Sequence, residues 1–112
     1  MATRPFAHNG SPSVTVPPGR TLQVETLSLQ VDISPPGSKL EAFVKYTCAG
    51  EPISLFVPLT YAYTEPGTGF DFHVAALRVL LYADAGTSIG VNVYSPTGAG
   101  GTLFITVSGQ LI

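Results

Sequence analysis

The sequence predicts an all-β protein built as an antiparallel two-sheet sandwich, jelly-roll-like, with about seven or eight strands and an extended N-terminal arm. Between its Pro and Gly clusters, nearly every segment alternates apolar and polar residues with a period of two, as strands with one buried face do. The clusters recur about every ten residues, a spacing typical of sandwiches. A chain of 112 residues is sized for one hydrophobic core. With one Cys and no Trp, it lacks the Cys-Trp-Cys core of a true immunoglobulin domain.

The first twelve residues differ in composition from the rest. Pro5, Gly10 and Pro12 lie among small polar residues, so residues 1–12 are expected to run extended over a surface as an arm. Residues 13–112 are expected to form a single β-sandwich domain. The surface under the arm is either its own domain or a partner, and the sequence leaves both open. The candidate partner contacts are Arg4, Pro5, Phe6 and His8.

Two strands are predicted before residue 34. Residues 13–16 form a short one, closed by the Pro17-Pro18-Gly19 turn. The next is long, and its apolar phase slips once. Because a slip of one residue moves every side chain to the other face, residues 25–26 are predicted to be a β-bulge or the point where the chain changes sheets. The apolar positions on either side of the slip are Leu22, Val24, Leu27, Leu29, Val31 and Ile33.

The middle of the chain alternates most regularly. Residues 40–46 are a third strand, and residues 53–61 are the cleanest period-two run. Pro58 within that run predicts a sheet edge or a bulge, because proline cannot donate to a ladder. Residues 63–69 are predicted to be a flexible loop.

The last third completes the strands. The periodicity of residues 70–81 also fits a short helix over 74–81, but their β-branched and aromatic content favours a strand. Asp84-Ala85-Gly86 makes a tight turn, and residues 89–93 and 103–111 are the final strands.

Composition limits the partners. Only 11% of the residues are charged and the net charge is −2, with the five basic residues scattered along the chain, which predicts neither nucleic acid nor an anionic membrane as a partner. Such sparse charge means that Ser, Thr and Gly keep the surface hydrated or that partner subunits cover part of it.

Cys48 is the single cysteine of the chain, which excludes an intrachain disulfide and favours an intracellular protein or a particle assembled inside a cell. No signal peptide or membrane helix is expected.

The residues that catalysis needs are scarce. His8 and His73 are too few for a cupin-type metal site, and no Ser lies in a nucleophile-elbow context. Asp71 and Glu65 could form a carboxylate pair, but solvated loop acids are the favoured explanation. A plain turn explains Asp84 better than a calcium site. We therefore expect no enzyme, no metal and no cofactor.

The best candidate for ligand recognition is the segment of residues 61–73, which concentrates aromatic rings beside hydrogen-bonding groups. Its candidate ligand-binding residues are Tyr61, Tyr63, Asp71 and His73. Sugars stack on aromatic faces and bond to such neighbours, so a carbohydrate-binding module is one functional hypothesis. The competing interpretation is that the rings cap the sandwich and the rest is turn chemistry.

Three segments carry a resemblance to a known class of protein. They are Val16-Pro-Pro-Gly-Arg-Thr-Leu-Gln-Val-Glu25, Leu77-Arg-Val-Leu-Leu-Tyr-Ala-Asp-Ala-Gly-Thr87 and Ile105-Thr-Val-Ser-Gly-Gln-Leu-Ile112. In its turns and alternating strands the chain resembles small bacterial and phage β-sandwich proteins, among them the jelly-roll decoration, or cement, proteins of tailed-phage capsids. The resemblance implies a virion protein, assembled in the host cytoplasm, that forms a homo-oligomer, often a trimer, over capsid-subunit junctions and stabilises the shell. A cytoplasmic protein is the alternative location.

Overall fold

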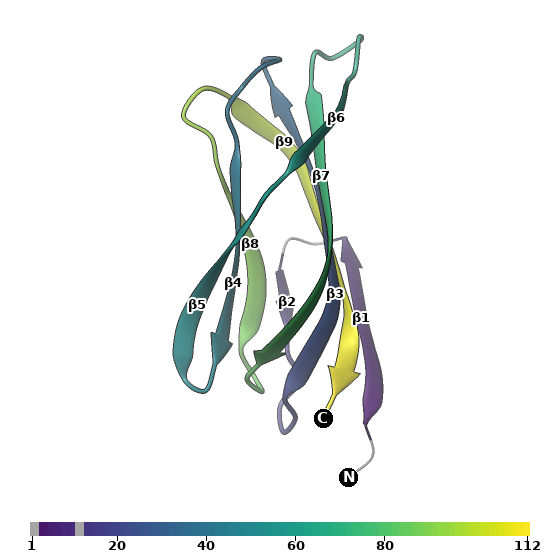
Figure 1. The fold of residues 1–112 in the computed structure, drawn as a ribbon, viewed down its shortest axis with the longest axis vertical. Helices are drawn as coiled ribbons and strands as arrows, with labels where there is room; N and C mark the ends of the chain where they lie inside the picture. The colour runs from purple at the N-terminus through teal and green to yellow at the C-terminus, as the bar shows by residue number, and fades with distance from the viewer. Residues whose placement is uncertain (1–2, 11–12) are drawn as a thin grey trace.

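The predicted all-β class is confirmed by a computed structural model that describes residues 3–10 and 13–112 (Figure 1). Within these ranges nine strands form two antiparallel sheets, and no helix is long and apolar enough to cross a membrane. The strands are β1 (Arg4–Gly10), β2 (Ser13–Thr15), β3 (Leu22–Ser34), β4 (Glu41–Cys48), β5 (Glu51–Val57), β6 (Thr60–Thr64), β7 (Asp71–Ala83), β8 (Ser88–Tyr94) and β9 (Ala99–Leu111). The jelly-roll character stays a prediction.

The two sheets face each other along a molecule of 51 × 24 × 19 Å. The five-stranded sheet has the order β1-β9-β3-β7-β6, and the four-stranded sheet has the order β2-β8-β4-β5. The chain passes from one sheet to the other at every connection except β4–β5 and β6–β7, and β5 is therefore followed by β6 in the opposite sheet. Strands β5 and β6 are therefore edges of different sheets on the same side of the sandwich (Figure 1).

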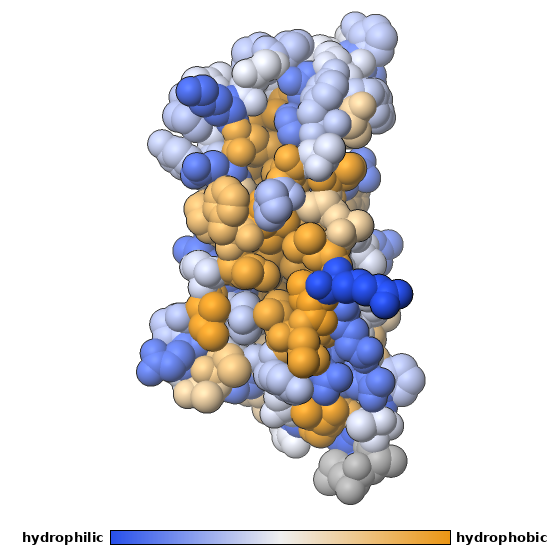
Figure 2. Space-filling model, viewed as in Figure 1, coloured by the Kyte–Doolittle hydropathy of each residue, from blue (hydrophilic) through white to orange (hydrophobic). Residues whose placement is uncertain are grey.

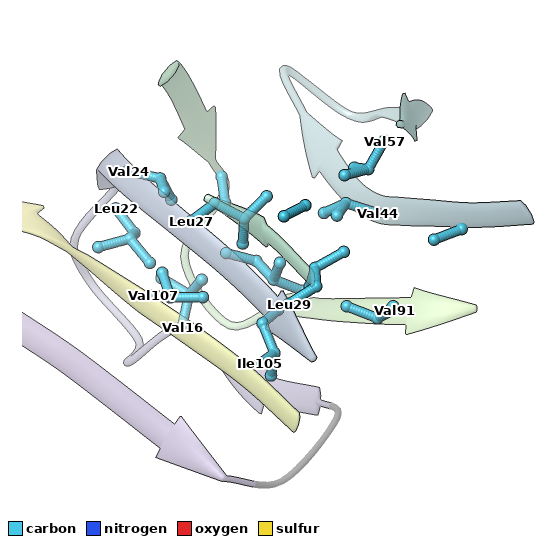
Figure 3. Close-up of a cluster of buried hydrophobic side chains, with 14 of the residues drawn as sticks. Val16, Leu22, Val24, Leu27, Leu29, Val44, Val57, Val91, Ile105 and Val107 are labelled. Carbon is cyan, nitrogen blue, oxygen red and sulfur yellow. The ribbon is translucent and has the colours of Figure 1, made fainter. Parts of the chain in front are cut away.

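The core lies between the sheets and follows the predicted alternation. Leu22, Ile33, Val44 and Ile105 are fully buried, with 0% of their surface exposed. Figure 3 shows such side chains pointing from both sheets into one continuous apolar cluster. Their burial removes apolar surface from water, which is the main force that holds the two sheets together.

The phase slip in β3 is a β-bulge. The registers of β3 with β7 and with β9 both shift between Val24 and Thr26, yet β3 stays between the same two neighbours throughout. The chain does not change sheets here. The bulge instead keeps Val24 and Leu27 on the buried face, although three positions separate them.

The run predicted as one strand over residues 53–61 is divided at Pro58. Strand β5 ends at Val57 in the four-stranded sheet, and β6 begins at Thr60 in the five-stranded sheet. The edge predicted at Pro58 is thus present, because both flanking strands are edge strands. The periodicity gave no sign of the break, since alternation continues when a chain passes from one buried face to another.

Strand β7 settles the choice between strand and helix for residues 70–81. The segment is extended from Asp71 to Ala83, and its burial alternates along most of its length. The loop predicted for residues 63–69 begins later than expected, because β6 continues to Thr64 before the turn.

Residues 4–10 of the predicted arm form an edge strand. Strand β1 pairs with β9 over its whole length, from Arg4 opposite Leu111 to Gly10 opposite Ile105. These residues therefore lie against their own domain. The arm positions 1–2 and 11–12 fall outside the described residues.

Candidate functional site

The β6–β7 hairpin brings together the four candidate ligand-binding residues. Its ladder sets Tyr61 opposite His73 and Thr64 opposite Asp71. The connecting loop is held by two backbone hydrogen bonds: the Glu65 N–H donates to the Phe70 carbonyl, and the Gly69 N–H donates to the Glu65 carbonyl, each at 2.9 Å. The segment singled out in the sequence is thus one local unit.

Asp71 is buried, with 4% of its surface exposed, and both of its carboxylate oxygens are engaged. Oδ1 accepts from the Thr64 hydroxyl at 2.5 Å, and Oδ2 accepts from the Gly37 N–H at 2.7 Å. Since a carboxylate only accepts, the Thr64 hydroxyl uses its single hydrogen to donate to Asp71. The Tyr61 hydroxyl, 2.6 Å from Thr64 Oγ1, is therefore the donor in that contact.

These contacts lower the pKa of Asp71 below its ordinary value. The Thr64 hydroxyl bond contributes most, followed by the Gly37 N–H, while burial opposes them and the charge of His73 assists them. Asp71 is thus an ionised anchor that ties the β3–β4 loop to the β6–β7 hairpin, and both of its oxygens are occupied by the protein.

The two tyrosines lie on opposite faces of the sheet. The register of β6 with β7 shifts between Tyr61 and Tyr63, so Tyr61 pairs with His73 and Tyr63 pairs with Phe72. His73 and Phe72 are neighbours on β7 and point to opposite faces. The Tyr61 and His73 rings meet edge to face, with centroids 5.8 Å apart. The Tyr63 and Phe72 rings are stacked, 4.7 Å apart at 8°. A ligand resting on one face meets one of the two tyrosine rings.

His73 is half-buried, and its Nδ1 atom is buried without a hydrogen-bond partner among the described residues. A buried polar nitrogen without a partner carries a desolvation cost. No group of three His, Cys, Asp or Glu side chains converges here or elsewhere in the described parts of the chain.

Asp84, weighed in the sequence as a calcium ligand, is occupied by the backbone. Its two oxygens accept from the N–H groups of Ala49 and Gly50 at 2.9 and 2.8 Å. It therefore anchors the β4–β5 turn, where Ala49 adopts a positive φ of 51°.

The four candidate partner contacts occupy β1 and differ in exposure. Arg4 and Pro5 are exposed, whereas Phe6 packs against the core and lies opposite Gly109. His8 is half-buried opposite Val107. Of this set, Arg4 and Pro5 offer the most surface to a partner.

Sequence reasoning missed an apolar opening along one side of the sandwich. Strand β6 pairs with β7 only as far as Val74, so no described strand covers the outer side of β7 from Ala75 to Ala83, which we call the open edge. Leu80 on this edge is 63% exposed. Figure 2 shows apolar side chains gathered between the two sheets on this side. The half-buried members of this apolar seam are Tyr46, Leu55, Leu77, Val79 and Leu81.

No protein-family model matches this chain, and no curated protein sequence does. Function is therefore inferred from the residues of this chain.

Proposed function

We propose that this chain is a non-enzymatic structural protein, a virion decoration (cement) protein that oligomerises and stabilises a capsid shell. The observation that carries the proposal is the open side of the sandwich, where the apolar seam lies beside the unpaired open edge of β7. Monomeric soluble proteins rarely expose a large contiguous apolar patch, and an unpaired strand edge is a template for pairing with another chain. Both features fit a molecule that works in contact with others.

Two further features support an assembly role. Asp71 and Asp84 are the carboxylates that the sequence offers to a ligand or a metal ion. Both have their oxygens occupied by protein donors and serve as structural anchors. Charged residues make up only 11% of the chain, which suits a surface partly covered by neighbours. The resemblance of the turns and strands to phage decoration proteins points the same way.

In this account the sandwich rests on the shell, and Arg4 and Pro5 at the exposed end of β1 contact a neighbour. Binding that occurs only in the assembled state stabilises that state by mass action. No covalent chemistry, metal or cofactor is required. The protein is located in the virion, after assembly in the host cytoplasm.

The test is to fractionate native source material on a density gradient and probe each fraction for this chain. Co-sedimentation with a large particle that survives a salt wash is the expected result. Recovery of the chain only in the slowly sedimenting fractions would remove the capsid role. Exchanging Arg4 and Pro5 for Ala, which leaves Phe6 packed, is expected to release the chain from the particle while its unfolding midpoint is unchanged.

As a second function we propose carbohydrate binding at Tyr63. Tyr63 is 53% exposed and its ring lies flat on Phe72, a geometry that suits stacking of a sugar on the remaining face. Tyr63→Ala is then expected to abolish binding on a glycan array. Tyr61→Ala is the matched variant, because Tyr61 is equally exposed, at 54%, on the other face. Absence of binding by the unaltered protein, or equal loss with both variants, would contradict a site centred on Tyr63.

A further inference from the structure

We propose that the open edge of β7 binds a second copy of this chain, with the two β7 strands pairing antiparallel about a twofold axis through Val79. The pairing would join the five-stranded sheets of two copies into one continuous sheet. This inference rests on the proposed assembly role and deepens it, because it names the first partner and the surface that it occupies.

The open edge differs from the other edges of the two sheets. Native edge strands are blunted by proline, by charge or by shortness. Strand β1 carries Arg4 and Pro5, and β5 carries Glu51 and Pro52. Strands β2 and β6 are only three and five residues long. The open edge has nine residues, 75–83, with no proline and a single charge, so it has the least protection against pairing.

The inward-facing row of the open edge is the same in both directions. Reading from residue 75 to 83, the alternate residues on this face are Ala75, Leu77, Val79, Leu81 and Ala83. In an antiparallel pair centred on Val79, each of these residues faces a residue of the same type on the partner subunit. Leu77 faces Leu81 of the partner subunit, and Val79 faces Val79 of the partner subunit. A twofold interface requires such self-complementarity, whereas pairing with a strand from an unrelated protein does not require it.

The outward-facing row of the open edge is complementary in size and charge. The same axis sets Ala76 opposite Tyr82 of the partner subunit, a small residue against a large one. It sets Arg78 opposite Leu80 of the partner subunit, so that the two arginines avoid facing each other. Leu80 is 63% exposed, more than any other large apolar side chain that the structure describes, and the aliphatic part of the arginine side chain would cover it. Tyr82 is 40% exposed in the single chain and would also be covered.

Pairing would also shelter the apolar seam. Leu77, Val79 and Leu81 are half-buried because no strand continues the sheet beyond them. On the facing sheet, Leu55 is half-buried for the same reason. A second sandwich beside β7 would extend the core across the axis, adding buried apolar surface to the strand hydrogen bonds.

The mass of the purified full-length protein tests the pairing, measured by sedimentation equilibrium over a wide concentration range. The unaltered chain is expected to be a dimer in equilibrium with monomer. Leu80→Lys places an ammonium opposite Arg78 of the partner subunit twice per dimer, and it should weaken dimerisation about 100-fold. Leu80→Glu loses the same apolar side chain but faces the same arginine, so its dissociation constant should stay within about tenfold of the original.

Tyr94→Lys is the matched control, since Tyr94 is 59% exposed on β8, away from the open edge. It should leave the dissociation constant unchanged. A protein that stays monomeric at about 100 μM, or equal weakening by Leu80→Lys and Leu80→Glu, would overturn the proposal.

Cysteine crosslinking tests the axis in a Cys48→Ser background. Only a residue on the axis meets itself, so Val79→Cys should crosslink two copies, whereas Leu77→Cys and Leu81→Cys should not. Crosslinking at either of these two positions instead would place the axis elsewhere and refute the assigned register.

The outcomes also separate this inference from the proposed function. A monomer that still co-sediments with particles refutes the β7 pairing alone, and a dimer absent from particles refutes the capsid role alone.

Discussion

Gly109 lies directly against the backbone of Gln23, where β9 meets the bulged part of β3. A Cβ atom at Gly109 would overlap the Gln23 carbonyl oxygen and lie 2.9 Å from its carbonyl carbon. Because the obstacle is backbone within the central strand, it cannot turn aside as a flexible side chain would. The bulge at Val24/Thr26 and the glycine at position 109 therefore depend on each other.

Gly109→Ala should lower the free energy of unfolding by about 1–3 kcal/mol, as overpacking of a close contact does. Urea denaturation followed by tyrosine fluorescence measures it. Gly67→Ala is the control, because a Cβ atom there would meet nothing within 4 Å. The control should change the free energy by less than about 0.5 kcal/mol. Equal effects of the two substitutions would show that β9 can move away from Gln23.

Deleting Glu25 should leave the protein folded, whereas deleting Ser28 should unfold it or come close to it. Without Glu25, Val24 and Leu27 lie two positions apart, so a regular strand keeps Leu22, Val24 and Leu27 on the buried face. Without Ser28, the buried residues on one side of the deletion would turn to the outer face, and losing their burial costs about 4–9 kcal/mol. Circular dichroism and thermal unfolding report the difference, and a Glu25 deletion that unfolds the protein as fully as the Ser28 deletion would contradict the bulge.

Asp71 should make stability depend on pH in acid. Its pKa is lower in the folded protein than the value of about 3.9 expected in the unfolded chain. Its contribution to the unfolding free energy is therefore fully present above the unfolded pKa and is lost as the pH falls through the folded pKa. The difference in unfolding free energy between the unaltered protein and Asp71→Asn should be fully present at about pH 5 and shrink below about pH 4.

Thr64→Val supports the same assignment, since it removes the donor that contributes most to the lowered pKa. In that background, the substitution Asp71→Asn should produce a smaller pH-dependent difference. A difference between the unaltered protein and Asp71→Asn that persists undiminished to about pH 2 would show that the Asp71 carboxylate is not the group responsible.

Asp84→Ala should lower the unfolding free energy by about 1–3 kcal/mol, because two backbone N–H groups in the β4–β5 turn lose a charged acceptor. Asp84→Asn keeps one carbonyl oxygen and should cost less. Glu51→Ala removes an exposed acid two positions after Ala49 and should cost less than about 0.5 kcal/mol. Chemical denaturation of the three variants measures these losses of unfolding free energy. An equal loss with Glu51→Ala and Asp84→Ala would indicate a general effect of negative charge and contradict the anchoring role of Asp84.

Local patterns allow most of the fold to be predicted, because period-two alternation and turn residues report which face of a strand is buried. The phase slip after Val24 is visible in the sequence, and a bulge is one of the two explanations that it allows. The division at Pro58 and the bulge between Tyr61 and Tyr63 are not predictable to the same degree. Both depend on which strand lies alongside, and that information is not local.

The same limit applies to the candidate sites. The sequence places the aromatic and acidic residues from Tyr61 to His73 in one short segment, but it does not predict the engagement of Asp71 by the distant Gly37 N–H. The open edge has no sequence signal either, because Leu77, Val79 and Leu81 alternate like any strand with one buried face. Their half-burial follows from the end of the β6 pairing at Val74, which no local pattern marks.

The most direct test of the assembly surface is amide hydrogen exchange of β7, followed by NMR at protein concentrations well below and well above the dissociation constant. Alternate residues along the open edge point their N–H groups away from β3, and these amides should exchange fast in dilute protein and slowly in concentrated protein. Amides of Arg4–Gly10 on β1 should show no such dependence. Exchange along the open edge that is independent of concentration, or protection that appears at β1 instead, would contradict pairing through β7.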